Sequence, residues 1–151
     1  MPDGYPELCA IVLDTTDARG LAEFYRELLG LIYRPGDERP IDGEADPRGR
    51  DWLVLTEDNG RARLAFQQVT EVAPSTWPHP AVPQQLHLDL AVSTTEELIK
   101  QHQRALDLGA SLLYDRFDDP DEPLYVYADP AGHPFCMLVG PTSVTPGAAT
   151  K

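Results

Sequence analysis

The sequence contains little positive charge and no long hydrophobic run. Its 151 residues include 12 Lys and Arg against 25 Asp and Glu, which gives a formal net charge of −13. Proteins that bind nucleic acid present a basic face to the phosphates, so this balance argues against nucleic acid as a partner. No apolar stretch approaches the roughly 18–20 residues that a membrane-spanning helix requires, so a membrane partner is not expected either.

Cysteine is scarce, and the N-terminal residues lack the pattern of a signal peptide. A basic segment followed by an apolar stretch is typical of secretory signals, and none occurs here. We therefore expect a cytoplasmic protein. The two thiols, Cys9 and Cys136, lie in apolar, strand-like stretches. In a cytoplasmic chain such cysteines are expected to be buried free thiols rather than a disulfide.

The first half of the chain follows a fixed order of strand and helix patterns. An apolar run over 8–13 predicts a strand. Residues 14–17 offer an N-cap for a helix that ends at Gly30, because apolar residues recur between them at spacings of three and four. A Pro- and Gly-rich stretch, 35–50, is a loop long enough to form a lid. Further strands are expected at 31–33, 52–56 and 64–69.

The second half begins with a Pro-rich segment, 70–84, which is predicted to be an extended linker. The earlier order of elements then starts again. A helix runs to Leu108 with Thr94 and Glu97 in capping-box spacing, and an acidic loop, 116–123, is expected to be solvated. The strands of this half are expected at 86–92, 111–114, 124–127 and 134–139.

The chain therefore contains a strand–helix–three-strand unit twice. An internal repeat of this kind predicts an α+β fold of two βαβββ modules, whose curved mixed sheets form a shared cavity. The expected domain boundaries are 1–69 for the first module, 70–84 for the linker, 85–140 for the second module and 141–151 for a disordered tail.

Three segments resemble a known superfamily. Residues 21–30, with a Phe-Tyr pair ahead of Leu-Gly, resemble the opening helix of vicinal-oxygen-chelate (VOC) proteins. Residues 128–135, Ala-Asp-Pro-Ala-Gly-His-Pro-Phe, are similar to the closing hairpin, and residues 85–90 resemble the start of the second module in the glyoxalase-like domain branch. The chain is identified as a member of the glyoxalase/bleomycin-resistance/extradiol-dioxygenase superfamily. The resemblance implies a homodimer that binds a small molecule in its cavity.

The resemblance also places the four cavity positions that hold a metal in metal-dependent members. They fall on Ala10, Gln67, His87 and Cys136. Ala10 cannot bind a metal and Gln67 is a weak ligand, whereas a catalytic divalent site needs three strong protein ligands and an open position. The resemblance therefore implies a bleomycin-resistance-like binder without the usual divalent metal and without another cofactor. A metal held by His87 and Cys136 remains open.

His87 and Asp89 are the candidate catalytic residues. They lie two apart on a predicted strand, so their side chains share a face. An imidazole titrates near neutral pH, so the pair could transfer protons, or it could be a structural hydrogen-bonded pair. The alternative function is therefore a lyase, isomerase or dioxygenase-type enzyme that uses His87 as an acid–base group or in an irregular metal site.

The remaining candidates are ligand-binding residues, each with a structural alternative. Gln67 could offer its amide to the ligand or pair with a neighbouring strand. Trp52, Tyr125 and Tyr127 could form aromatic walls for a flat ligand or belong to the core. Cys136 could contact the ligand or act as a nucleophile, although a buried inert thiol is the simpler reading.

Overall fold

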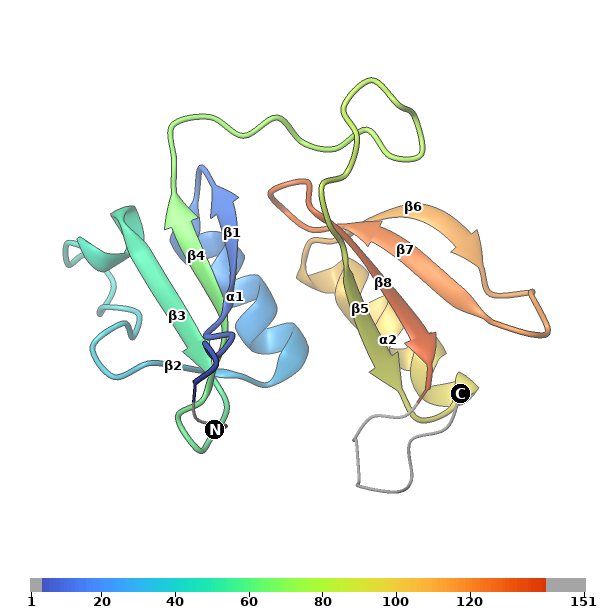
Figure 1. Ribbon diagram of the computed structural model, residues 1–151, viewed down its shortest axis with the longest axis horizontal. Coiled ribbons are helices and arrows are strands. Elements are labelled where there is room, and N and C mark those ends of the chain that lie inside the picture. Colours follow the sequence, from blue (N-terminus) through green and yellow to red (C-terminus); the bar gives the residue numbers. More distant parts are fainter. Residues whose placement is uncertain (1–3, 141–151) are drawn as a thin grey trace. The chain divides into compact units, whose positions relative to one another are not determined.

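The computed structural model describes residues 4–140, which divide into two units (Figure 1). The first unit ends at Val72 and the second begins at Ala73. This boundary lies inside the segment predicted to be a linker, and residues 73–84 group with the second unit. The predicted tail, 141–151, lies outside the described residues.

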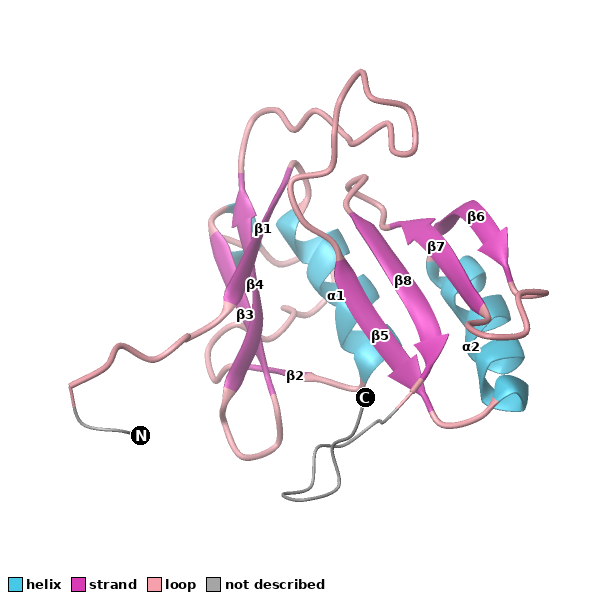
Figure 2. Ribbon diagram, turned by 45° about the vertical axis from the view of Figure 1, so that its right-hand side comes forward, coloured by secondary structure: helices cyan, strands magenta, loops and turns pink. Residues whose placement is uncertain are grey.

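The first unit is a four-stranded sheet packed against one helix (Figures 1 and 2). Its sheet has the strand order β1-β4-β3-β2, in which β1 and β4 are parallel and the other pairs are antiparallel. The elements are β1 (Ile11–Thr15), α1 (Ala18–Leu29), β2 (Ile32–Tyr33), the 3₁₀ helix η1 (Arg48–Arg50), β3 (Trp52–Thr56) and β4 (Ala62–Gln68).

Local sequence explains where α1 begins and ends. The Asp17 carboxylate accepts a hydrogen bond from the Gly20 N–H at 3.0 Å and caps the first turn. Gly30 ends the helix with φ of 68°, a left-handed conformation that favours glycine. The predicted apolar face is buried, and the Tyr25 ring stacks on Phe66 of β4 with centroids 6.0 Å apart. Cys9 precedes β1 and is exposed, so the prediction of a buried thiol is wrong there.

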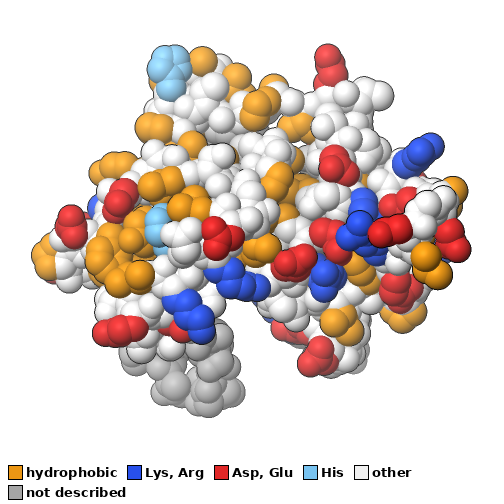
Figure 3. Space-filling model, turned by 180° about the vertical axis from the view of Figure 1, so that it is seen from behind, with side chains coloured by type: hydrophobic (Ala, Val, Ile, Leu, Met, Phe, Trp, Pro, Cys, Tyr) orange, Lys and Arg blue, Asp and Glu red, His pale blue; other side chains and the backbone are white. Residues whose placement is uncertain are grey.

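The long loop between β2 and β3 is tied to its unit by ion pairs, one of them to a fully buried carboxylate. The Asp37 carboxylate is fully buried and accepts from the Val54 N–H at 3.0 Å and from Arg48 at 2.9 Å. Arg19 on α1 donates to both carboxylate oxygens of Asp46 at 2.9 Å. These contacts do not favour the lid that the composition allows. Seen from behind, the surface of this unit shows basic side chains set among acidic ones (Figure 3).

The second unit repeats the same plan with the strand order β5-β8-β7-β6, and β5 and β8 form its parallel pair. Thr94 caps the helix by accepting from the Glu97 N–H at 3.1 Å, as its spacing predicts. The elements are β5 (Leu88–Val92), α2 (Thr95–Leu108), β6 (Ser111–Arg116), β7 (Leu124–Ala128) and β8 (Pro134–Val139). The prediction of an α+β fold with two βαβββ modules is confirmed. Within residues 4–140, no helix combines the length and apolarity needed to cross a bilayer.

Candidate functional site

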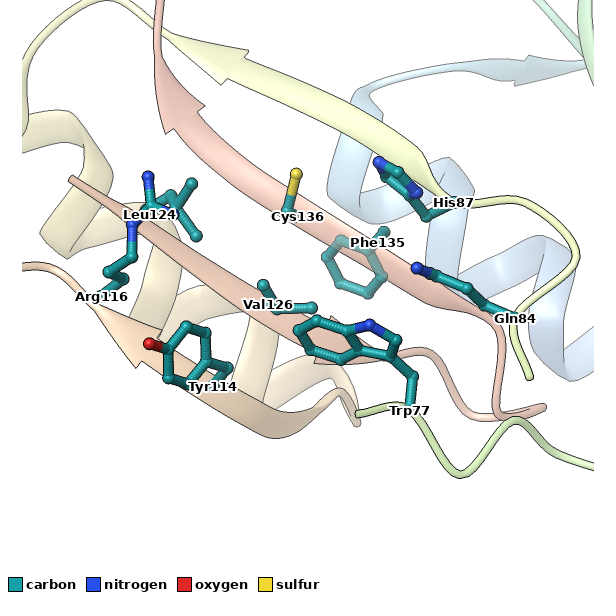
Figure 4. Close-up of a pocket in the computed structure, with 9 residues that line it drawn as sticks. All are labelled: Trp77, Gln84, His87, Tyr114, Arg116, Leu124, Val126, Phe135 and Cys136. Carbon is teal, nitrogen blue, oxygen red and sulfur yellow. The ribbon is translucent and has the colours of Figure 1, made fainter. Parts of the chain in front are cut away.

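The candidate site is a pocket of about 180 Å³ within the second unit (Figure 4). Tyr125 and Tyr127 of β7 face α2, where both contact the His102 ring, so Val126 between them faces the opposite side of the sheet. Val126 pairs with Cys136 of β8, and both line the pocket on this open face. The nine lining residues are Trp77, Gln84, His87, Tyr114, Arg116, Leu124, Val126, Phe135 and Cys136.

Aromatic side chains form one side of the pocket. The rings of Trp77 and Tyr114 meet edge to face, with centroids 6.3 Å apart and an interplanar angle of 70°. Tyr114 comes from edge strand β6 and remains 48% exposed. Phe135 of β8 is buried below them, with its ring stacked on Tyr127 at a centroid distance of 4.9 Å. A wall of this kind favours a flat, largely apolar ligand.

The segment that carries Trp77 has its own hydrogen-bonded structure. Thr76 and Val82 exchange backbone and side-chain hydrogen bonds, with Thr76 N–H donating to the Val82 carbonyl at 2.8 Å and Val82 N–H donating to Thr76 Oγ1 at 2.8 Å. Pro74 packs directly on Gly132 in the β7–β8 turn, where a side chain would overlap it. These contacts hold the Pro-rich segment against the second unit and place Trp77 at the pocket.

The polar edge of the pocket is a cluster of His87, Asp89 and Cys136. The parallel register of β5 and β8 sets Asp89 opposite Cys136, whose thiol donates to Asp89 Oδ1 at 2.6 Å. The same oxygen lies 3.3 Å from Nε2 of His87, just before β5. Burial, and secondly the hydrogen bond to Asp89, raises the pKa of the Cys136 thiol to about 12. The thiol is therefore protonated at neutral pH, which does not favour a nucleophile.

Arg116 lies at the far end of the pocket with two carboxylates on its guanidinium. One terminal nitrogen donates to Glu122 Oε1 at 3.1 Å, and Nε lies 3.4 Å from Asp119 Oδ2. That Nε atom is buried and its approach to Asp119 does not meet the geometry of a hydrogen bond. Backbone N–H groups, and more weakly Arg116, lower the pKa of Asp119, so its carboxylate stays charged. The positive charge of Arg116 is thus compensated locally.

The structure brings three of the predicted site residues together and separates the others. His87, Asp89 and Cys136 form one cluster, as described. Tyr125 and Tyr127 are instead core residues: they are 7% and 0% exposed and lie under α2, where the Tyr127 hydroxyl is 2.7 Å from His102 Nδ1. They therefore do not line this pocket, and their burial matches the core alternative that the sequence left open.

Trp52 and Gln67 belong to the first unit. They lie opposite each other on β3 and β4, and the pocket of the second unit does not include them. The neighbouring amide of Gln68 has a structural role, because its Oε1 accepts from the Ala18 N–H at 2.8 Å and its Nε2 donates to the Thr16 carbonyl. Sequence reasoning missed the pocket residues Trp77, Gln84, Tyr114 and Arg116, since neither the Pro-rich segment nor the edge strand was expected to reach a site.

The cluster offers one nitrogen, one oxygen and one sulfur donor to a metal ion. The donor atoms of His87, Asp89 and Cys136 all lie within 4.8 Å of one another. A tetrahedral zinc ion with bonds of about 2.0–2.3 Å holds its ligand atoms about 3.6 Å apart, so small movements would bring the three into range. This mixture suits a borderline-soft cation better than a hard one that prefers oxygen. The resemblance gave only two strong metal ligands, His87 and Cys136, and the structure adds Asp89 as a third.

Comparisons with known proteins identify a family model and solved structures that are similar to this chain. The family model described as "Glyoxalase-like domain" matches residues 10–138. A glyoxalase/bleomycin resistance protein/dioxygenase family enzyme from Burkholderia phytofirmans has a similar structure, with a TM-score of 0.63 and 17% identity over 89% of this chain and 98% of its own. None of the curated proteins matches the sequence.

Two further solved structures have the same fold. A glyoxalase/dioxygenase from Nostoc punctiforme gives a TM-score of 0.63 at 18% identity, covering 93% of this chain and 95% of its own. The fosfomycin resistance protein FosX from Listeria monocytogenes, as a mutant complexed with Mn(II) and dihydroxypropylphosphonic acid, gives 0.61 at 16% identity over 91% and 94%. With a family model that covers most of its length, this chain belongs to the glyoxalase-like domain family of the glyoxalase/bleomycin-resistance/dioxygenase (VOC) superfamily.

Proposed function

We propose that this chain binds a small, flat organic molecule in the pocket of its second unit, without the divalent metal usual in the superfamily. The pocket itself is the observation that carries the proposal. Its aromatic side, made by Trp77 and Tyr114 above the buried Phe135, faces a polar edge made by His87 and Cys136. Small-molecule sites combine mostly apolar walls with a few polar groups that fix orientation.

The polar edge gives the ligand both a donor and an acceptor. Gln84 carries an amide with both functions, and its side chain points into the pocket (Figure 4). His87 is 48% exposed at its side chain, so its ring can be reached by a ligand. Cys136 already donates to Asp89, which leaves its sulfur as a weakly polar surface. The ligand is thus expected to direct its polar edge toward Gln84 and His87.

The second candidate is an enzyme built on the same cluster. His87 and Asp89 lie 3.3 Å apart at the pocket edge, which suits proton transfer to or from a bound molecule. A zinc-like ion held by His87, Asp89 and Cys136 would supply Lewis-acid chemistry when bound. Manganese, which the FosX complex contains, is not the ion expected at this cluster, because its sulfur donor suits softer ions.

Metal content and ligand-induced stability separate the two candidates. We expect the purified protein to hold far less than one metal ion per chain, and its melting temperature to rise with small aromatic compounds, since ligands that bind only the folded state stabilise it. Tyr114→Ala should reduce that rise, because Tyr114 forms an exposed pocket wall. Tyr5→Ala, which changes an exposed tyrosine of the first unit, is the matched control.

Three results would contradict the proposal of a metal-free binding pocket. Stoichiometric zinc that disappears in a His87→Ala variant would contradict the metal-free proposal and support the second candidate. Equal ligand stabilisation in Tyr114→Ala and the unaltered protein would place the ligand elsewhere. Turnover of a bound compound that is abolished in Asp89→Asn, with binding retained, would identify the cluster as an acid–base site.

We further propose that the protein is cytoplasmic and forms a homodimer. Superfamily membership supports the dimer, and neither property depends on the pocket geometry. Light scattering coupled to size-exclusion chromatography tests the dimer directly: a mass near twice the 16.7 kDa of one chain is expected, and a mass near 16.7 kDa would overturn it.

A further inference from the structure

The second unit, which holds the pocket, is mostly acidic in its charged side chains. Residues 73–140 contain ten Asp and Glu against three Lys and Arg. Arg116 is the one Lys or Arg among the nine lining residues. An anionic ligand would need this guanidinium as its counter-charge, so what Arg116 already contacts decides the sign that the pocket accepts.

Arg116 already has two carboxylates as counter-charges. Its terminal nitrogen donates to both the carboxylate and the backbone carbonyl of Glu122, at 3.1 and 3.3 Å. Asp119 approaches Nε at 3.4 Å on the other side. One positive charge therefore has two negative charges in contact, and the local sum is negative. A negatively charged ligand that approaches Arg116 would be repelled by these two carboxylates.

The negative potential reaches the polar edge of the pocket. The Asp89 carboxylate contacts Cys136 there at 2.6 Å, so a negative charge lies at the pocket edge. A carboxylate at this place disfavours any anion bound beside it. The same field favours a cation.

The aromatic side of the pocket acts in the same direction. The faces of tryptophan and tyrosine rings carry partial negative charge and attract cations placed over them within about 6 Å of the centroid. Trp77 and Tyr114 supply two such rings at the pocket. Ring faces and carboxylates thus favour the same kind of ligand.

We infer that the pocket selects a small planar ring that carries a positive charge over neutral or anionic rings of the same shape. This inference rests on the proposed function, since it names the class of ligand for the same pocket. It predicts that phosphonates and carboxylates, which need a free cationic group, are poor ligands here.

Three isosteric probes test the sign of the charge directly: benzamidine as the cation, benzamide as the neutral ring and benzoate as the anion. Trp52→Phe leaves Trp77 as the single tryptophan, so fluorescence quenching reports the pocket. At about pH 8, where an ordinary imidazole is neutral, and at low salt, benzamidine should bind at least about tenfold more tightly than benzoate, with benzamide between them. Added salt should narrow the difference.

Glu122→Gln is the variant that sharpens the test. It removes one of the two charges that compensate Arg116, so benzamidine should weaken and benzoate should strengthen, and the ratio of their affinities should fall about threefold or more. Glu96→Gln makes the same change of charge in the first turn of α2 and should leave the ratio close to that of the parent.

A loss of charge selectivity can be told apart from the absence of a ligand-binding pocket. Benzoate binding as tightly as benzamidine, or equal ratios in the Glu122→Gln and Glu96→Gln variants, would overturn the charge selectivity while leaving a ligand-binding pocket in place. If none of the three probes quenches Trp77, the inference fails, and the thermal-shift screen with Tyr114→Ala still decides the proposed function.

Discussion

The two units share one scaffold, but three neighbouring positions on the open face of the sheet are apolar in the first unit and polar in the second. β1 and β5 have the same length, and each is followed by its helix N-cap at the same spacing, so Ala10 and Val12 correspond to His87 and Asp89. Val12 pairs with Ala65 in the parallel register of the first unit.

In the second unit Asp89 pairs with Cys136, which makes Ala65 the counterpart of Cys136. Gln67 is one alternation further along β4, opposite Asp14. The first unit therefore presents Ala10, Val12 and Ala65 where the second presents a nitrogen, an oxygen and a sulfur group. The corresponding backbones position these residues, and only the side chains of the second unit offer polar groups at the three positions.

The long loops of the two units also differ in what their polar groups do. In the first unit, the carboxylate of Asp37 is buried and binds Arg34, Arg48 and the Val54 N–H. Its charges maintain the structure of the loop. In the second unit, the segment with Trp77 is held by Thr76, Val82 and Pro74, and it leaves an aromatic ring at an open pocket. The candidate pocket thus lies in the unit whose Trp77 segment is held by hydrogen bonds and a proline–glycine contact.

Asp37→Asn should give the largest loss of stability, confined to the first unit. The substitution sets a buried amide N–H group against donors that now bind the carboxylate, Arg48 and the Val54 N–H, and removes the charge-assisted hydrogen bonds, which together cost about 3 kcal/mol of unfolding free energy. Urea denaturation measures the loss, and ligand-dependent quenching of Trp77 should persist under conditions where the protein remains folded.

Asp42→Asn is the matched control for this prediction. Its carboxylate is 95% exposed and lies 3.7 Å from Arg39, so its loss should cost less than about 0.5 kcal/mol. Equal losses in the two variants would show that the buried carboxylate does not hold the loop.

Gly60→Ala and Gly132→Ala compare the corresponding hairpin turns of the two units. Both glycines have positive φ, 86° and 95°, so alanine costs about 1 kcal/mol at either position. At Gly60 the added methyl meets open space, whereas at Gly132 it overlaps Pro74. Gly132→Ala should therefore cost about 2 kcal/mol or more, measured by denaturation.

Gly132→Ala should also weaken ligand binding, because Pro74 positions the segment that carries Trp77. Gly60→Ala should leave binding unchanged. If both variants bind equally well, contact between Pro74 and the β7–β8 turn is not what places the aromatic wall.

The repeat and the element order could be predicted because they depend on local signals. Apolar spacing, caps such as Asp17 and Thr94, and the glycines that end both helices are all visible along the chain. Side chains alternate between the two faces of a strand, which was enough to predict that His87 and Asp89 share a face. Their meeting with Cys136 depends on the parallel register of β5 and β8, which joins residues far apart in sequence.

The aromatic wall was beyond sequence reasoning for a physical reason. Alternation shows that Tyr125 and Tyr127 share a face but does not say whether that face lies under the helix or toward the pocket. The direction is set by packing against His102 of α2. Trp77 reaches the pocket through hydrogen bonds and a proline–glycine contact within a segment whose prolines suggested only an extended connection.

The smallest expected effect concerns the two thiols, one in each unit. Cys9 is exposed and should react readily with a thiol reagent, whereas the pKa of about 12 keeps Cys136 protonated and slow. In a Cys9→Ser background, Asp89→Asn should speed alkylation of Cys136 by about tenfold for each unit by which its pKa falls. The rate should stay below that of Cys9, because burial is the larger cause of the raised pKa and remains in the variant. Asp107→Asn, on the exposed side of α2, is the control.

The same pKa predicts how this thiol affects stability with pH. Because the folded-state pKa is raised from an ordinary 9.0 to about 12, the folded state favours the neutral thiol, and its contribution is complete below about pH 9 and lost as pH rises toward 12. Unfolding in urea across this range should show a smaller alkaline loss in Cys136→Ser than in the parent, since Ser does not titrate there. Cys9→Ser should follow the parent. An equal alkaline loss in both variants, with Cys136 alkylated as fast as Cys9, would mean that the cluster on β5 and β8 does not distinguish the second unit chemically from the first.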